Sequence, residues 1–324
     1  MSVHGAGVIQ LSESTVSRLI QSTGNLYWTH SEYGVGGENS VYRASKSSTP
    51  GEEIALYGEP YQGGVPGSKN FGAIVWAKIG EEYYGYFVAN DKQQGTSEIK
   101  RISLAGGGSA DVLATSPAEI GDRDLATNGA YLCWADAQGI RSMPIEGGPV
   151  TTLASGEFVH LAMHGSTVYY PSEEHILSVA DTGGPVDAVV QADATVTALY
   201  VGSAPERAVA ERARRRLAPP IISDRPMVSW GQVDGAVKSV VIGQAASTVY
   251  QQASEATVAT VSWAGSRLLW TNAYGRGSAV QMWTGGSTTT VYGDPSIDRF
   301  APVDVQGDSA AAYVADEVVF RRIF

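Results

Sequence analysis

The sequence predicts an all-β protein built from repeated antiparallel sheets, and three observations predict it. A motif of glycine, alternating apolar residues and an aromatic residue occurs four times, at 24–29, 129–134, 165–170 and 265–270. Each copy is followed by a polar loop, a second apolar run and a Gly-Gly turn. The 38 glycines and 16 tyrosines among 324 residues suit many short strands joined by tight turns. Self-similarity at this spacing is typical of closed arrays of stacked units, so we expect a seven-bladed β-propeller in one domain over residues 1–324.

The clearest blade lies in the middle of the chain. Its four strands are expected at Asp124 to Asn128, Ala130 to Trp134, Ile140 to Ile145 and Val150 to Ala154. The Glu146-Gly147-Gly148-Pro149 turn joins the last two strands, and hairpins of this kind build one antiparallel sheet. The next blade repeats the pattern from His160 to Val190.

The other blades are decorated versions of this unit. They are expected at Thr15 to Tyr57, Phe71 to Leu113, Thr195 to Gln252, Thr257 to Tyr292 and Ala301 to Phe324. The last unit is one strand short, and the strand at Gly7 to Leu11 has no unit of its own. We expect the N-terminal strand to complete the last blade and close the ring, which removes the exposed sheet edges of an open array.

One segment interrupts the β pattern in blade five. Residues 205–217 are rich in alanine, arginine and glutamate, and Pro219-Pro220 follows them. Strong helix formers before a proline stop predict one short helical insertion at about 203–224. The insertion is either a solvated decoration or a basic docking element for an acidic protein partner.

Composition limits the classes of partner and compartment. A net charge of −11 is unsuited to a general phosphate-binding surface, so no nucleic-acid partner is expected. No run approaches the roughly 18 apolar residues of a membrane span, and the N-terminus lacks the pattern of a signal peptide. We therefore expect a cytoplasmic protein with no membrane partner. Cys133 is the only cysteine, and its apolar neighbours predict a buried side chain rather than a nucleophile.

Two stretches resemble known propeller repeats. Leu26-Tyr27-Trp28-Thr29, followed by Ser40 to Arg43, resembles the YWTD-type repeat of lipoprotein-receptor propellers, with His30 at the place of the aspartate. Residues 139–156 are similar to a blade ending of bacterial propellers, a group that includes the virginiamycin B lyase family. The resemblance implies the propeller architecture. It transfers no catalytic residue, and the structural role of the YWTD aspartate does not carry over to His30.

Candidate site residues follow from the expected architecture. The first strand of each blade lines the central channel, and ligands bind where polar groups converge in a concave site. Asp124 and His160 occupy equivalent positions of neighbouring blades, so they are the predicted catalytic acid–base pair, in which the carboxylate would raise the pKa of the imidazole. The alternative is a structural hydrogen bond that joins two blades. The predicted ligand-binding residues are Arg18, His30, Arg123, Tyr274 and Arg299.

No cofactor and no metal site is predicted, because the sequence has no zinc motif, calcium loop or phosphate-binding glycine loop. Three functions stay open. The first is a small-molecule site at the channel mouth, which extends to a cofactor-independent lyase or cyclase. The second is a protein-interaction scaffold, and the third, less favoured, is a lectin. The sequence also leaves open whether side chains such as Met163, Tyr200 and Trp263 fill the channel.

Overall fold

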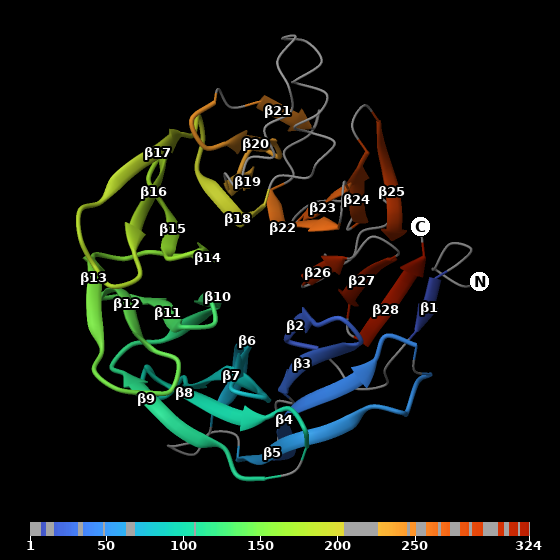
Figure 1. Cartoon of the computed structure of the whole chain (residues 1–324). Coiled ribbons are helices and arrows are strands. Elements are labelled where there is room, and N and C mark those ends of the chain that lie inside the picture. The colour runs from blue at the N-terminus through green and yellow to red at the C-terminus, as the bar shows by residue number, and fades with distance from the viewer. Residues whose placement is uncertain are drawn as a thin grey trace.

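The structure of the chain is a computed structural model. The structure describes residues 8–10, 16–31, 35–47, 49–62, 69–106, 108–203, 226–244, 247–250, 257–264, 267–272, 279–284, 287–293, 304–307, 311–316 and 318–323. These residues form 28 strands, which pair into seven four-stranded antiparallel sheets around a central axis (Figure 1). The chain therefore has the blade arrangement of a β-propeller.

Six blades each use four consecutive strands. Blade one contains β2 (Arg18–Gln21), β3 (Asn25–Ser31), β4 (Val35–Ser45) and β5 (Ile54–Gln62). Blade two contains β6 (Asn70–Ile79), β7 (Glu82–Asp91), β8 (Thr96–Ser103) and β9 (Asp111–Ser116). Blade three contains β10 (Ile120–Thr127), β11 (Tyr131–Asp136), β12 (Gly139–Pro144) and β13 (Thr151–Ser155).

The second half of the ring continues in the same way. Blade four contains β14 (Ala162–His164), β15 (Thr167–Ser172), β16 (His175–Ala180) and β17 (Asp187–Gln191). Blade five contains β18 (Val196–Ser203), β19 (Pro226–Gln232), β20 (Val237–Val241) and β21 (Ser247–Tyr250). Blade six contains β22 (Val258–Ala264), β23 (Arg267–Asn272), β24 (Ala279–Trp283) and β25 (Thr288–Gly293).

The remaining sheet combines both ends of the chain. It holds β26 (Asp304–Gly307), β27 (Ala311–Asp316), β28 (Val318–Ile323) and β1 (Val8–Gln10). Strand β1 pairs antiparallel with β28, with Ile9 opposite Arg321. The innermost strands β2, β6, β10, β14, β18, β22 and β26 contact one another in sequence, and β26 contacts β2. Pairing the two chain ends in one sheet closes the ring.

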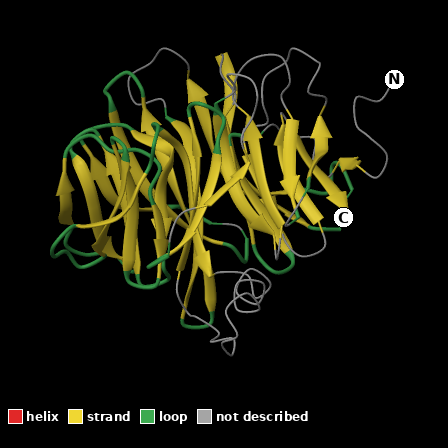
Figure 2. Ribbon diagram, turned by 90° about the horizontal axis from the view of Figure 1, so that it is seen from above, coloured by secondary structure: helices red, strands yellow, loops and turns green. Residues whose placement is uncertain are grey.

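The predicted fold class needs a correction at the helical insertion. The described residues contain strands but no helix, as Figure 2 shows. The arginine-rich segment 205–217 lies outside the described residues, and of the predicted range only Ser203 is described, as the last residue of β18. The prediction rested on intrinsic helix propensity, which is a weak guide because a short helix gains most of its stability from tertiary packing.

Aromatic side chains fill the spaces between blades. Trp134 is 1% exposed and packs with Ala73 and Tyr86 of blade two, while Trp230 packs with Tyr169 of blade four. The alternation of strand residues sends these rings to one face of each sheet, where the neighbouring blade covers them. Cys133 is buried as predicted, and burial raises the pKa of its thiol to about 12.

Glycine turns connect the outer edges of neighbouring blades. Gly147 has a φ of +97°, and a Cβ at that position would lie 3.7 Å from Leu113 Cδ2 of blade two. Gly183 has a φ of +91° and lies in the same way over Leu153 of blade three. A left-handed backbone favours glycine. The Gly-Gly motif therefore lets each turn rest on a leucine of the preceding blade.

Candidate functional site

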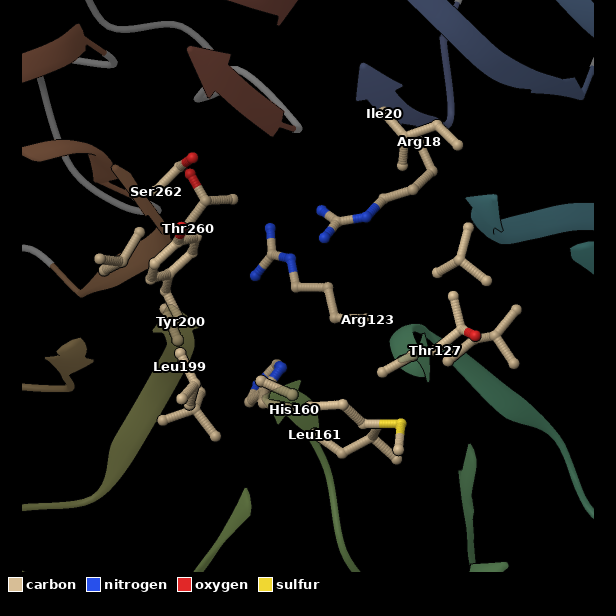
Figure 3. Close-up of a pocket in the computed structure, with 18 of the residues that line it drawn as sticks. Arg18, Ile20, Arg123, Thr127, His160, Leu161, Leu199, Tyr200, Thr260 and Ser262 are labelled. Atoms are coloured by element: carbon tan, nitrogen blue, oxygen red, sulfur yellow. The ribbon is translucent and has the colours of Figure 1, made fainter. Parts of the chain in front are cut away.

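A cavity of about 550 Å³ lies on the propeller axis. Its described walls come from the inner strands of blades one to six (Figure 3). Met163 and Tyr200 line this cavity, whereas Trp263 donates a hydrogen bond of 2.9 Å to Ser229 of blade five and is not among the lining residues. The channel is therefore not filled by these three side chains.

Two arginines converge in the cavity from blades one and three. Arg18 is the first residue of β2, and Arg123 lies in β10. Figure 3 shows both guanidinium groups directed toward the middle of the cavity. Arg123 Nη1 donates a hydrogen bond to the carbonyl oxygen of Ala259 in β22, so this side chain reaches from blade three to blade six. The backbone contact fixes the position of one guanidinium in the channel.

His160 reaches the same space just before β14. Its φ of +60° lies in the left-handed region, which a residue other than glycine rarely adopts. Its ring Nδ1 is buried and has no hydrogen-bond partner among the described residues. Burial, followed by the charges of Arg123 and Arg18, lowers the pKa of His160 to about 4. The imidazole is therefore neutral at pH 7.

Asp124 holds the backbone of His160. Its side chain is buried at 6% exposure, and Oδ1 accepts a hydrogen bond of 2.5 Å from the His160 backbone N–H. Its second oxygen lies so close to Gly121 that a Cβ there would come within 2.2 Å of it. Burial raises the pKa of Asp124 to about 6, against the lowering effect of hydrogen bonds from the backbones of His160 and Gly121. This carboxyl group stabilises the left-handed turn at His160 and joins blades three and four.

The expected carboxylate–imidazole pair therefore needs a correction. Asp124 bonds the backbone of His160 and not its ring. The pKa of His160 is lowered rather than raised, because the ring is buried and two arginine charges act on it. The geometry matches the alternative of a structural hydrogen bond between blades, and a catalytic role for either residue stays a prediction.

A smaller pocket of about 280 Å³ adjoins the same residues. Arg18, Arg123 and His160 line both pockets, while Asp122 and Asp124 line only the smaller one. The three basic side chains therefore stand between a space with acidic walls and the larger cavity.

The other predicted ligand-binding residues are not brought into this site. His30 lies in β3 with its ring 6.1 Å from the ring of Tyr42, and it does not line the cavity. Tyr274 and Arg299 lie outside the described residues. The sequence analysis missed Thr260 and Ser262, which line the cavity from β22. Their alternate spacing on an inner strand was the available signal, since residues i and i+2 share one face.

Within the described part of the chain, no group of three or more histidine, cysteine, aspartate or glutamate side chains could hold a metal ion. None of the described elements is a helix long and apolar enough to cross a membrane.

Known proteins are similar to this chain in fold only. No protein-family model and no curated protein matches the sequence. The WD40 β-propeller domain of Doa1 has a TM-score of 0.64 and 13% identity, over 98% of this chain and 95% of that domain. The chain has the β-propeller fold. A chain in the crystal structure of the mitotic checkpoint complex has a TM-score of 0.61 and 14% identity, with 96% of each chain covered.

A larger protein contains a similar domain. The extracellular domain of a hybrid two-component system from B. thetaiotaomicron has a TM-score of 0.61 and 10% identity. The match covers 97% of this propeller and 39% of that chain, so the propeller spans well under half of its length. Similarity at such low identity shows the fold alone. Membership of the YWTD-type or virginiamycin-B-lyase-type propellers stays a prediction.

Proposed function

We propose that this propeller is a protein-interaction scaffold that binds a partner along the outer edge of blades one to four. The observation that carries the proposal is a row of exposed aliphatic side chains. Ile54, Val112, Val150 and Val186 are 50%, 51%, 44% and 46% exposed. Each lies within one residue of the first residue of the outermost strand of its blade, on the perimeter seen in Figure 1.

The outer edges of neighbouring blades touch one another at their glycine turns. Turns of blades two, three and four lie over Leu56, Leu113 and Leu153 of the preceding blades. Single exposed apolar residues are common on any protein, but a repeated set along one edge is typical of an interaction surface. The row therefore supports a macromolecular partner with apolar contact residues.

Acidic side chains flank the apolar row. Asp111, Glu146 and Asp187 are exposed and lie next to Val112, near Val150 and next to Val186 respectively. The chain as a whole carries a net charge of −11. This edge is complementary to a partner that carries basic residues beside apolar ones. Opposite charges on the two surfaces speed their association and fix the orientation in which they bind.

The comparisons support a scaffold at the level of fold only. One similar chain belongs to the mitotic checkpoint complex, and another is a WD40 propeller. The segment 205–217 remains a second predicted protein contact. A cytoplasmic location, a lyase or cyclase activity and a lectin function also stay predictions. The lyase has less support, because Asp124 is bonded to the backbone rather than to the imidazole.

The test compares two sets of surface variants. Val150→Glu with Val186→Glu alters the row, and Val233→Glu alters a residue of equal exposure, 47%, in a turn of blade five. Chemical cross-linking in extracts of the source cell is followed by quantitative mass spectrometry. We expect a protein that cross-links to the wild type and to the Val233 variant but not to the row variant, while all three keep the same melting temperature. Equal cross-linking by both variants, or no cross-linked protein at all, would refute the scaffold at this edge.

A further inference from the structure

The central cavity is basic inside an acidic protein. Its described lining residues include Arg18, Arg123 and His160 and no aspartate or glutamate. The chain carries 33 acidic and 22 basic side chains, so an acid-free lining is not expected from composition. Two described carboxylates close to the arginines, Asp122 and Asp124, line the smaller adjoining pocket. The described walls of the larger cavity therefore carry positive charge, while Asp122 in the adjoining pocket lies close enough for the charges of Arg18 and Arg123 to oppose the rise in its pKa that burial causes.

The basic groups have the geometry of an anion site. Both guanidinium groups point into the middle of the cavity in Figure 3, and the His160 ring faces the same space. Two guanidinium groups that face one space both attract an anion placed between them, and the two Coulomb attractions add. Arginine binds carboxylate and phosphate oxygens through a planar fork of donors, with more directional preference than lysine.

The remaining walls are mainly apolar. Leu125, Leu161, Leu199, Val201 and Val261 line the cavity together with the ring of Trp76. A volume of about 550 Å³ lies within the usual range of small-molecule sites, which are largely apolar with a few convergent polar groups. This volume and these walls suit an organic body larger than an inorganic ion.

We infer that the channel binds a small organic anion, with a carboxylate or phosphate head between Arg18 and Arg123 and an apolar body against the leucine and valine walls. The neutral His160 ring supplies a further hydrogen bond through Nδ1, which has no partner among the described residues. Thr260 and Ser262 line the opposite wall, and the Thr260 hydroxyl is hydrogen-bonded to the Thr271 hydroxyl at 2.9 Å. This site is separate from the outer edge of blades one to four.

The test is calorimetric titration of the full chain with three probes of similar shape. Benzoate and phenyl phosphate carry an anionic head, and benzyl alcohol is neutral. We expect at least one anion to bind at least tenfold more tightly than benzyl alcohol, and to lose affinity on raising the salt concentration, because salt screens charge. A preference between the two anions identifies the head group as a carboxylate or a phosphate.

Variants assign the binding to the two arginines. Arg18→Gln and Arg123→Gln are each expected to weaken the preferred anion at least tenfold. Arg43→Gln is the matched control, because Arg43 donates a hydrogen bond of 2.8 Å to the carbonyl oxygen of Leu104 and does not line the cavity. Arg18→Lys keeps the charge but removes the planar pair of guanidinium donors, so it is expected to lose part of the affinity for the anion. This variant also serves as a test if a glutamine variant does not fold.

Several results would overturn the inference. They are equal affinity for benzyl alcohol and the anions, no binding of any probe by the folded wild type, or unchanged affinity in every folded channel variant. Titration of the Val150→Glu and Val186→Glu variant separates this inference from the proposed scaffold. Unchanged anion affinity there, with loss of the cross-linked protein, shows that the two surfaces act independently.

Discussion

The buried carboxyl group of Asp124 gives a sharp prediction about stability and pH. Folding raises the pKa of this group from 3.8 to about 6, mainly because its side chain is buried at 6% exposure. Between these values the folded protein holds a proton that the unfolded chain has released. Raising the pH through this window therefore lowers the free energy of unfolding, and the loss is complete just above pH 6.

The magnitude follows from the pKa shift. Moving the pKa from 3.8 to about 6, at about 1.4 kcal/mol per pH unit, corresponds to about 3 kcal/mol over the full pH window. Asp124→Asn removes the titration while its side-chain oxygen still accepts the His160 N–H. We expect the free energy of unfolding of the variant, relative to the wild type, to rise by about 2.4 kcal/mol between pH 4 and pH 7.5, because part of the full effect already lies below pH 4. The variant also loses one hydrogen bond at Gly121, and this loss lowers its free energy of unfolding by the same amount at every pH.

The comparison with a variant is needed because His160 titrates in the opposite sense. Its pKa falls from 6.5 to about 4 on folding, so the unfolded chain binds the extra proton between these values. Its contribution therefore increases stability as the pH rises, and it offsets that of Asp124 in the wild type. Subtracting the wild-type curve from the variant curve cancels the histidine contribution.

The assay is urea unfolding at intervals from pH 4 to pH 8. Asp193→Asn is the control, because Lys238 and Gln232 hold the pKa of Asp193 at about 2 and its carboxylate is ionised in both states above pH 5. Its difference from the wild type is expected to be constant there. If the difference in the free energy of unfolding between Asp124→Asn and the wild type is also constant from pH 4 to pH 7.5, burial of the ionised Asp124 carboxylate does not destabilise the fold, and the argument is refuted.

Three further predictions concern packing and turns. Gly147→Ala is expected to cost about 1–2 kcal/mol in urea unfolding, because φ is +97° there, whereas Gly24→Ala has open space and a φ outside the left-handed region and is expected to be near neutral. Equal effects of the two would contradict the conformational argument. Trp134→Ala is expected to cost about 3–5 kcal/mol, measured by the same unfolding assay, since the ring is 1% exposed between blades two and three. A cost below about 1 kcal/mol would show that this ring is not a packing element. Cys133 is expected not to react with a thiol reagent at pH 8 until the protein is unfolded, and rapid labelling of the native protein would contradict its burial.

Sequence reasoning located much of the architecture. The four-strand unit around Gly129 matches blade three, and the N-terminal strand pairs with the last blade, since Ile9 lies opposite Arg321. Both follow from local information: alternating apolar residues mark strands, and glycine pairs mark turns with positive φ. The predicted helix was the weak point, because composition alone carries no information about packing partners.

The sequence by itself determined the repeat, the acidic charge and positions from which residues reach the channel, among them Arg18, Arg123 and His160. Only the tertiary structure decided what these side chains do. It turned Asp124 toward the backbone of His160, directed both arginines into one cavity, and left that cavity without an acidic group among its described walls. The physical reason is that strand periodicity fixes the face on which a residue lies. Its burial, partner and protonation depend on neighbouring blades far away in the sequence.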